Sequence, residues 1–242
     1  MTNLALIDAD ILVWGASYEK ENMYDVAEYL EYKLAEILQN TESYHYKFFL
    51  GGYNNFRYHI RGDYKANRTG EHPVLFEATK DYVVNSLNAF VSNGVETDDS
   101  IVATAKYVVD NKLFNPIVCS TDKDFKIKPL TIYSWERHIK GNVFPHSLTT
   151  ITEKQALQNF YGMLLTGDSG DNIKICKGIG KTRAAKMLSG LSQYDMTRTV
   201  ISTYKSFYGS RWRHKLTEVF HLINLIDDYN RVKVPKAFDF AL

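Results

Sequence analysis

The sequence predicts an α/β fold with a mainly parallel central sheet flanked by helices, followed by a C-terminal helical region. A short apolar run over Leu4–Ile7 that ends in Asp8 is typical of a buried strand. Similar runs alternate with amphipathic stretches up to about residue 150. Beyond that point strand signals fade and helical periodicity continues. We therefore expect an α/β core over 1–150 and a helical region over 151–242.

Hydrophobic spacing places the elements in order. After the strand at Leu4–Ile7, apolar residues from Val26 to Leu38 recur at helical spacing and predict a helix over about 23–39. Further strands are expected at 47–50, 116–119 and 131–135, and further helices at 76–91, 98–109 and 152–165. Two glycines, Gly51 and Gly52, close the second strand.

Composition excludes several classes of protein. The 242 residues are 45% hydrophobic and 24% charged, which is typical of a globular chain. Two cysteines, Cys119 and Cys176, are too few for a disulfide framework or a thiolate zinc site. No apolar run reaches the roughly 18 residues of a membrane span, and the N-terminus lacks the basic start of a signal peptide. We expect a soluble, cytoplasmic monomer with no membrane partner.

Charge is divided unevenly along the chain. Residues 173–242 carry 13 Lys and Arg against 5 Asp and Glu, whereas residues 1–172 carry 16 against 23. The basic part is suited to a polyanion, although helices with solvated Lys and Arg would give the same balance.

Acidic residues gather where the predicted strands end. Nine carboxylates follow predicted strands, begin the predicted helix near residue 98 or follow the predicted helix over 152–165: Asp8, Asp10, Glu96, Asp98, Asp99, Asp122, Asp124, Asp168 and Asp171. The carboxyl ends of parallel strands meet at one edge of a sheet. Carboxylates 4 Å apart repel by roughly 4 kcal/mol at an effective dielectric of 20, so a shared cleft needs cations. Oxygen ligands favour Mg²⁺ or Mn²⁺, and two such ions can hydrolyse a phosphodiester.

Two other interpretations of these residues are open. Each Asp, taken alone, is also a common turn former or helix cap. The pair Asp8 and Asp10 with Gly167-Asp168 also superficially resembles the haloacid dehalogenase phosphatases. Ile11-Leu12 departs from that pattern, which also gives no role to Glu96–Asp99.

A glycine turn follows the last acidic pair. Gly178 and Gly180 permit a tight turn that exposes backbone N–H groups at the start of a helix. Lys181, Arg183 and Lys186 add positive charge there. This is the pattern of a helix–hairpin–helix that holds a nucleic-acid backbone, although an ordinary turn between helices has the same glycines.

Together these motifs resemble the 5′-nuclease family, which includes bacteriophage 5′→3′ exonucleases, ribonuclease H-type flap nucleases and the 5′-nuclease domain of bacterial DNA polymerase I. Five ordered motifs carry the resemblance, ahead of the glycine turn: Ile7-Asp8, Tyr64–Arg68, Glu96–Asp99, Ser120–Phe125 and Gly167–Asn172. The resemblance implies a PIN-like core and hydrolysis at 5′ ends and flaps of DNA and at RNA–DNA primer junctions. The short length looks most like a phage replication enzyme.

The resemblance also implies roles for individual residues. Asp8, Glu96 and Asp98 would form a first metal site, and Asp122, Asp124, Asp168 and Asp171 would form or support a second, with Asp98 or Asp99 near both. The ions would be two Mg²⁺, replaceable by Mn²⁺, with K⁺ at the hairpin. Lys65 and Arg68 would contact the scissile phosphate. Trp14 would stack on a base, unless it is a core residue.

The sequence departs from the family at two points. The family usually has another Asp at the end of the second strand, and here the matching position is Gly52, with Asp10 as a partial substitute. The segment expected to form an arch, 69–94, is short and has Lys80 as its only Lys or Arg. The alternative to a nuclease is therefore a branched-DNA-binding protein with a weakened metal site.

Overall fold

A computed structural model describes residues 1–18, 20–236 and 240. The strands are β1 (Asn3–Asp8), β2 (Ser43–Gly51), β3 (Phe90–Ser92), β4 (Asn115–Cys119), β5 (Thr131–Ser134), β6 (Arg137–Ile139), β7 (Asn142–Phe144) and β8 (Ser147–Thr150). The helices are α1 (Ala9–Ser17), α2 (Met23–Thr41), α3 (Arg57–Ile60), α4 (Phe76–Asn85), α5 (Thr97–Asp110), α6 (Glu153–Thr166), α7 (Lys181–Leu188), α8 (Gln193–Tyr208) and α9 (Trp212–Ile223).

Six strands form the central sheet in the order β3-β2-β1-β4-β5-β8. All pairs are parallel except β5 with β8, which is antiparallel. The predicted fold class is therefore confirmed. Because β1 is central and Asp8 is its last residue, the chain turns directly from the middle of the sheet into α1, and the sheet's carboxyl edge begins there.

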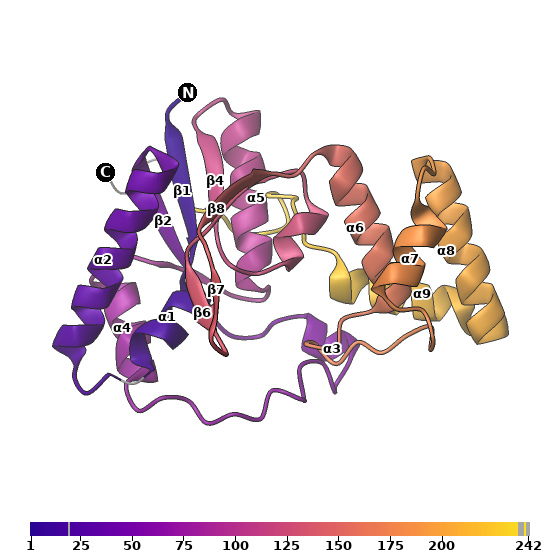
Figure 1. Cartoon of the computed structure of the whole chain (residues 1–242), viewed down its shortest axis with the longest axis horizontal. Helices are drawn as coiled ribbons and strands as arrows, with labels where there is room; N and C mark the ends of the chain where they lie inside the picture. Colours follow the sequence, from indigo (N-terminus) through magenta and orange to yellow (C-terminus); the bar gives the residue numbers. More distant parts are fainter. Residues whose placement is uncertain (19, 237–239, 241–242) are drawn as a thin grey trace.

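The two faces of the sheet are covered by different helices (Figure 1). Alternate residues of β1 point to opposite faces: Ala5 and Ile7 pack with α1, α2 and α4, whereas Leu4 and Leu6 pack with α5. This second hydrophobic cluster continues through α6 into α7, α8 and α9. The helical region thus packs beside α5, the helix that begins with Glu96 as its N-cap.

The structure corrects several expected elements. The helix expected over 76–91 ends at Asn85, and the last of these residues begin edge strand β3, after Asn88 with its φ of 51°. Consequently the predicted arch over 69–94 does not stand free: α4 packs on α1 and α2, and β3 joins the sheet. Helix α1, the β6–β7 hairpin and β8 were not anticipated. Within the described residues, no helix is long and apolar enough to span a bilayer.

Candidate active site

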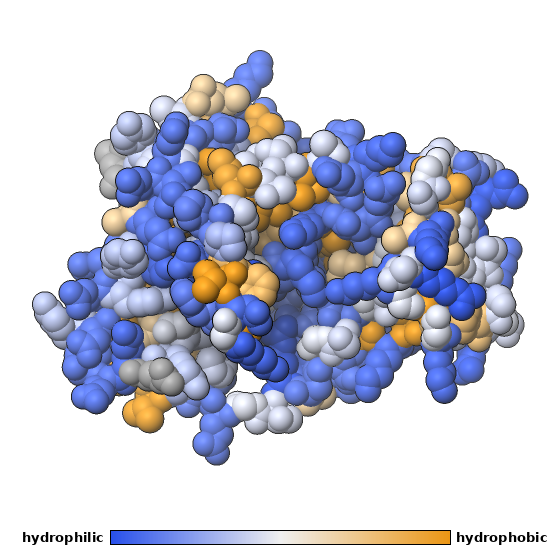
Figure 2. Space-filling model, viewed as in Figure 1, coloured by the Kyte–Doolittle hydropathy of each residue, from blue (hydrophilic) through white to orange (hydrophobic). Residues whose placement is uncertain are grey.

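A narrow pocket lies at the carboxyl edge of the sheet, where β4 ends and α5 begins. Six of the predicted carboxylates line it: Glu96, Asp98, Asp122, Asp124, Asp168 and Asp171. The same pocket is lined by Tyr64, Lys65 and Arg68 of the basic motif. In the view of Figure 1 this region lies between α1 and α6, and Figure 2 shows a hollow of mostly hydrophilic residues there. Three of the four predicted acidic groups therefore converge in the pocket. Asp8 and Asp10, the fourth group, do not line it, although the charge of Asp8 acts on Asp98.

One part of the acidic set is paired with cations. Lys65 contacts Glu96, and Arg68 Nη2 lies 2.6 Å from Asp171 Oδ1. Lys123 bridges Asp124, at 2.9 Å, and Asp168. Burial is the largest single influence and acts to raise the pKa of Asp168, but the hydrogen bond and charge of Lys123, with backbone hydrogen bonds from Gly170 and Asp171, together lower it. Lys123 was not singled out in the sequence, although it lies inside the Ser120–Phe125 motif.

The other part has no cationic partner. Among the described residues, Asp8, Asp98 and Asp122 make no ion pair, and Asp8 is only 3% exposed. Asp8 Oδ2 accepts a hydrogen bond of 2.7 Å from Ser120 Oγ, but its Oδ1 is buried without a hydrogen-bond partner. Burial, and then the charge of Asp10, raise the pKa of Asp8 to about 7. Burial, followed by the charge of Asp8, also raises the pKa of Asp98 well above its usual value.

These features decide whether a divalent cation suits the site. No three Asp, Glu, His or Cys side chains of the described chain already converge as a closed set of ligands. The available donors are carboxylate oxygens, as hard cations require, and the orphaned Oδ1 of Asp8 faces uncompensated negative charge. The donor set therefore fits a divalent metal ion that draws these side chains together.

Asp99 is a correction to the predicted metal ligands. Its Oδ2 lies 2.5 Å from Arg57 Nη1, and its Oδ1 lies 3.0 Å from Arg57 Nη2. The Ile226 N–H also donates to Oδ1, at 2.8 Å. Both partners are fully buried, and Asp99 does not line the pocket. Asp99 therefore joins α5 to α3 and to the end of the helical region. Because successive residues of a helix point in different directions, Asp98 lines the pocket while Asp99 does not.

Hydrogen bonds from the backbone and from side chains hold the basic motif, Tyr64–Arg68, against the 169–171 segment. Lys65, with a φ of 56°, donates its N–H to Asp171 O at 3.1 Å, and Asn67 Nδ2 donates to Ser169 O at 2.8 Å. The Tyr64 hydroxyl donates to Asp171 Oδ2 at 2.8 Å. Lys65 and Arg68 are thus brought into the pocket as expected, and Tyr64 is an additional residue that fixes them.

The glycine turn forms as the motif predicts. Gly178 has a φ of 88°, and Gly180 is the N-cap of α7, so the backbone N–H groups at its start are open to solvent. A groove of about 760 Å³ lies between α6 and α7 and is lined by Gly180, Lys181 and Asp168, which joins it to the acidic pocket. Arg183 turns back to Gly178 O at 3.4 Å, and Lys186 is exposed.

Trp14 lies outside the pocket. It is 41% exposed on α1, with its ring 5.4 Å from that of His72 and 5.3 Å from that of Phe76. Trp14 is therefore not a core residue. Its ring contacts connect α1 to the 69–75 loop through His72 and to the start of α4 through Phe76. Its predicted stacking on a base stays a prediction.

The structure also revises the glycine comparison at the end of β2. A Cβ on Gly52 would lie 2.4 Å from Asn93 Oδ1 and 2.6 Å from the Ser92 carbonyl oxygen. A Cβ on Gly51 would meet only the side chains of Asp10 and Thr97, at 3.1 Å and beyond. Gly51, rather than Gly52, is the position from which a side chain could reach the site.

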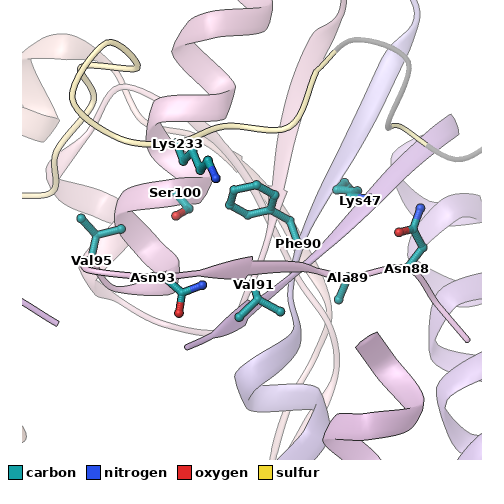
Figure 3. A pocket seen from close by; sticks show the side chains of 9 residues that line it. All are labelled: Lys47, Asn88, Ala89, Phe90, Val91, Asn93, Val95, Ser100 and Lys233. Carbon is teal, nitrogen blue, oxygen red and sulfur yellow. The ribbon is translucent and has the colours of Figure 1, made fainter. Parts of the chain in front are cut away.

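A second pocket, of about 370 Å³, lies away from the carboxylates beside edge strand β3 (Figure 3). It is lined by Phe90, Asn93, Ser100 and Lys233 among others, and contains none of the predicted site residues. We therefore assign the chemistry to the carboxylate pocket.

A mainly parallel sheet, a carboxylate pocket at its carboxyl edge and an attached glycine turn define a PIN-like α/β class. No family model matches the chain. The chain is 28% identical over 232 residues to flap endonuclease Xni of Shewanella frigidimarina, covering 90% of this chain and 87% of that protein. It is 29% identical over 181 residues to flap endonuclease Xni of Shewanella denitrificans, covering 69% of this chain and 66% of that protein.

Among solved structures, the bacteriophage T5 D15 flap endonuclease, in complex with DNA and metal ions, aligns with a TM-score of 0.58 at 14% identity. The alignment covers 91% of this chain and 99% of the T5 chain. The ordered motifs and these relatives agree in likening the chain to the 5′-nuclease family, and the T5 structure shows a similar fold.

Proposed function

We propose that this protein is a metal-dependent phosphodiester hydrolase that acts as a 5′→3′ exonuclease and flap endonuclease on DNA. One observation carries the proposal: six carboxylates line one pocket with Lys65 and Arg68, and a groove leads from it to the glycine turn. Carboxylates select a divalent cation, and basic side chains select a phosphate. The Xni relatives and the T5 enzyme support the same activity through their names.

Asp8, Asp98 and Asp122 would hold the first divalent ion, and Asp124, Asp168 and Asp171 would support a second, with Glu96 between the two groups. When bound, such ions supply an activated water and stabilise the leaving oxygen. We propose Mg²⁺ as the usual ion and Mn²⁺ as a substitute.

The basic side chains would bind the phosphates of the substrate. Lys65 and Arg68 would orient the scissile phosphate and offset the charge that develops on it. They are fixed in place because their loop is bonded to the 169–171 segment. Lys123 would have to release Asp124 and Asp168 for an ion to bind between them. The N–H groups at the start of α7, with Lys181, would hold a backbone phosphate away from the cut, and K⁺ could bridge that contact.

Finer features extend this proposal. Substrates would include 5′ flaps, 5′ ends and RNA–DNA primer junctions, cut by a cytoplasmic monomer during DNA replication. Phage replication was expected from the sequence, but the curated relatives are bacterial, so either source suits the same chemistry.

The test uses a 5′-flapped duplex labelled at the flap end, incubated with Mg²⁺, with Mn²⁺ or with EDTA. We expect cutting near the junction that EDTA abolishes and that Asp122→Asn reduces by roughly 100-fold or more. Asp81→Asn is the matched control, because it makes the same charge change at an exposed position of α4. Absence of metal-dependent cutting by the unaltered protein would refute the proposal.

One observation favours a second candidate function. No β2 side chain reaches the site from Gly51, so a branched-DNA-binding protein with little cleavage is the alternative. Tight, salt-sensitive binding of the flapped duplex without cutting in either metal would select it.

A further inference from the structure

The carboxylate of Asp10 occupies the end of β2, beside the acidic pocket. The Gly51 N–H donates to Asp10 Oδ1 at 3.0 Å, and the Thr97 hydroxyl donates to Asp10 Oδ2 at 2.5 Å. Asp10 belongs to the first turn of α1, yet these bonds connect it to β2 and to the first residue of α5. Its position is therefore fixed by three elements that surround the site.

Asp10 takes the space that a side chain from β2 would use. A Cβ on Gly51 would lie 3.1 Å from Asp10 Oδ2 and 3.4 Å from its Oδ1. In the parallel pairing of β1 and β2, Asp8 is opposite Phe49, two residues before Gly51. The two strands therefore end side by side, and Asp10 places a carboxylate where β2 itself has none.

The surroundings of Asp10 lack positive charge. Its hydrogen-bond donors are a backbone amide and a hydroxyl, and among the described side chains no Lys, Arg or His pairs with it. Asp8, Asp98 and Asp122 share that lack of a cationic partner, and Asp8 Oδ1 is buried with no hydrogen bond. Asp8, Asp10, Asp98 and Asp122 thus make no ion pair with a described side chain, although the charge of Lys65 acts on Asp98, and a bound ion would offset much of their mutual repulsion.

We infer that Asp10 contributes its carboxylate to the divalent-cation site of Asp8, Asp98 and Asp122, in place of a side chain from β2. The inference rests on the proposed function, since it assumes that this pocket binds a metal. It explains how the chain tolerates glycine at position 51: the negative charge enters from α1 instead of from β2.

Metal binding by the full chain tests the inference without relying on turnover. Isothermal titration with Mn²⁺ compares the unaltered protein, Asp10→Asn and the control Asp81→Asn. Asparagine keeps an oxygen that can accept from Gly51 N–H and removes the charge, while its Nδ2 can donate to the Thr97 hydroxyl in place of accepting from it. We expect Asp10→Asn to weaken Mn²⁺ binding by about 10- to 100-fold, and Asp81→Asn to leave it unchanged. The rise in unfolding temperature on adding Mn²⁺ should shrink in parallel.

A charge-transfer variant tests the placement. Asp10→Ser removes the oxygens that crowd position 51, and Gly51→Asp then returns a carboxylate from β2. The double variant should recover most of the affinity that Asp10→Ser loses. A double variant that binds Mn²⁺ no better than Asp10→Ser would overturn the assignment.

The outcomes separate the two proposals. If the unaltered protein binds Mn²⁺ and Asp10→Asn binds it equally well, the Asp10 inference fails and the proposed nuclease stands. If the unaltered protein binds no Mn²⁺, the metal-dependent function fails and the inference fails with it.

Discussion

Replacing Arg57 by methionine should destabilise the protein by about 3–5 kcal/mol, the usual cost of leaving a buried charge without its partner. Arg57 is fully buried and donates two bonds to Asp99, at 2.5 Å and 3.0 Å. It also donates to Leu222 O at 3.1 Å and to Asn224 O at 2.9 Å. Methionine would fill much of the volume but would leave the Asp99 carboxylate and two carbonyl groups short of donors.

The consequence reaches the active site, because Asp99 accepts from Glu96 N–H at 3.1 Å at the start of α5. Losing Arg57 would loosen the turn that places Glu96 and Asp98. At roughly 2–4 °C per kcal/mol for a chain of this size, the unfolding temperature should fall by about 6–20 °C. Urea unfolding followed by circular dichroism measures the loss, and Mn²⁺ titration measures the effect on the site.

The control is Lys106→Met, which breaks the exposed pair with Asp110 and should cost no more than about 1 kcal/mol. Arg57→Met/Asp99→Leu should recover part of the stability, since it removes the unpaired charge. If Arg57→Met costs no more than Lys106→Met, the pair does not hold α5 to the helical region and the reasoning is wrong.

Three further predictions concern the site and its surroundings. Because burial and then Asp10 raise the pKa of Asp8 to about 7, from an ordinary 3.8, protonation stabilises the folded state. In EDTA, this contribution should be complete below about pH 3.8, decline as the pH rises and be lost above about 7; unfolding temperatures at pH 6 and pH 8 measure its last part, and Asp8→Asn should flatten the difference. Gly52→Ala should cost about 1–3 kcal/mol in urea unfolding because its Cβ would lie 2.6 Å from the Ser92 carbonyl oxygen, whereas Gly51→Ala should cost less. Lys181→Ala should reduce the salt dependence of duplex binding by about one unit of slope, measured by fluorescence anisotropy, and an unchanged slope would place Lys181 outside the DNA contact.

The sequence predicts best where one signal decides the outcome. Leu4–Ile7 is a short apolar run that ends in Asp8, as a strand buried on both faces does, and β1 lies at the centre of the sheet. The helix expected over 76–91 was wrong beyond Asn85, because hydrophobic spacing does not reveal that Phe90–Ser92 pair with β2 as an edge strand. The β6–β7 hairpin could not be predicted from apolar alternation, because its strands have only three residues each.

The same distinction applies to the candidate site. Acidic residues that end strands could be expected to converge, because parallel strands end at one edge. The partner of each carboxylate could not be expected in the same way. Asp98 and Asp99 are adjacent in one motif, yet Asp98 lines the pocket and Asp99 binds Arg57, 42 residues away along the chain. The distinction depends on helix rotation and on a long-range contact, neither of which is a property of the motif.

In the pocket, Lys65 and Arg68 pair with carboxylates, and the same two side chains are the ones proposed to bind a phosphate. Lys65 is 18% exposed and lies against Glu96, so much of the cost of removing its ammonium group from water is already met by folding. In the proposed function, a phosphate that approached Lys65 and Arg68 would replace their carboxylate partners, and the released carboxylates would become available to a divalent ion. Asp8, Asp98 and Asp122 need no such exchange, because no cation of the described chain pairs with them. Under the proposed function, the carboxylates of β1 and α5 would therefore be open to an ion without breaking an ion pair, whereas those of the 168–171 loop would exchange Lys and Arg partners for one.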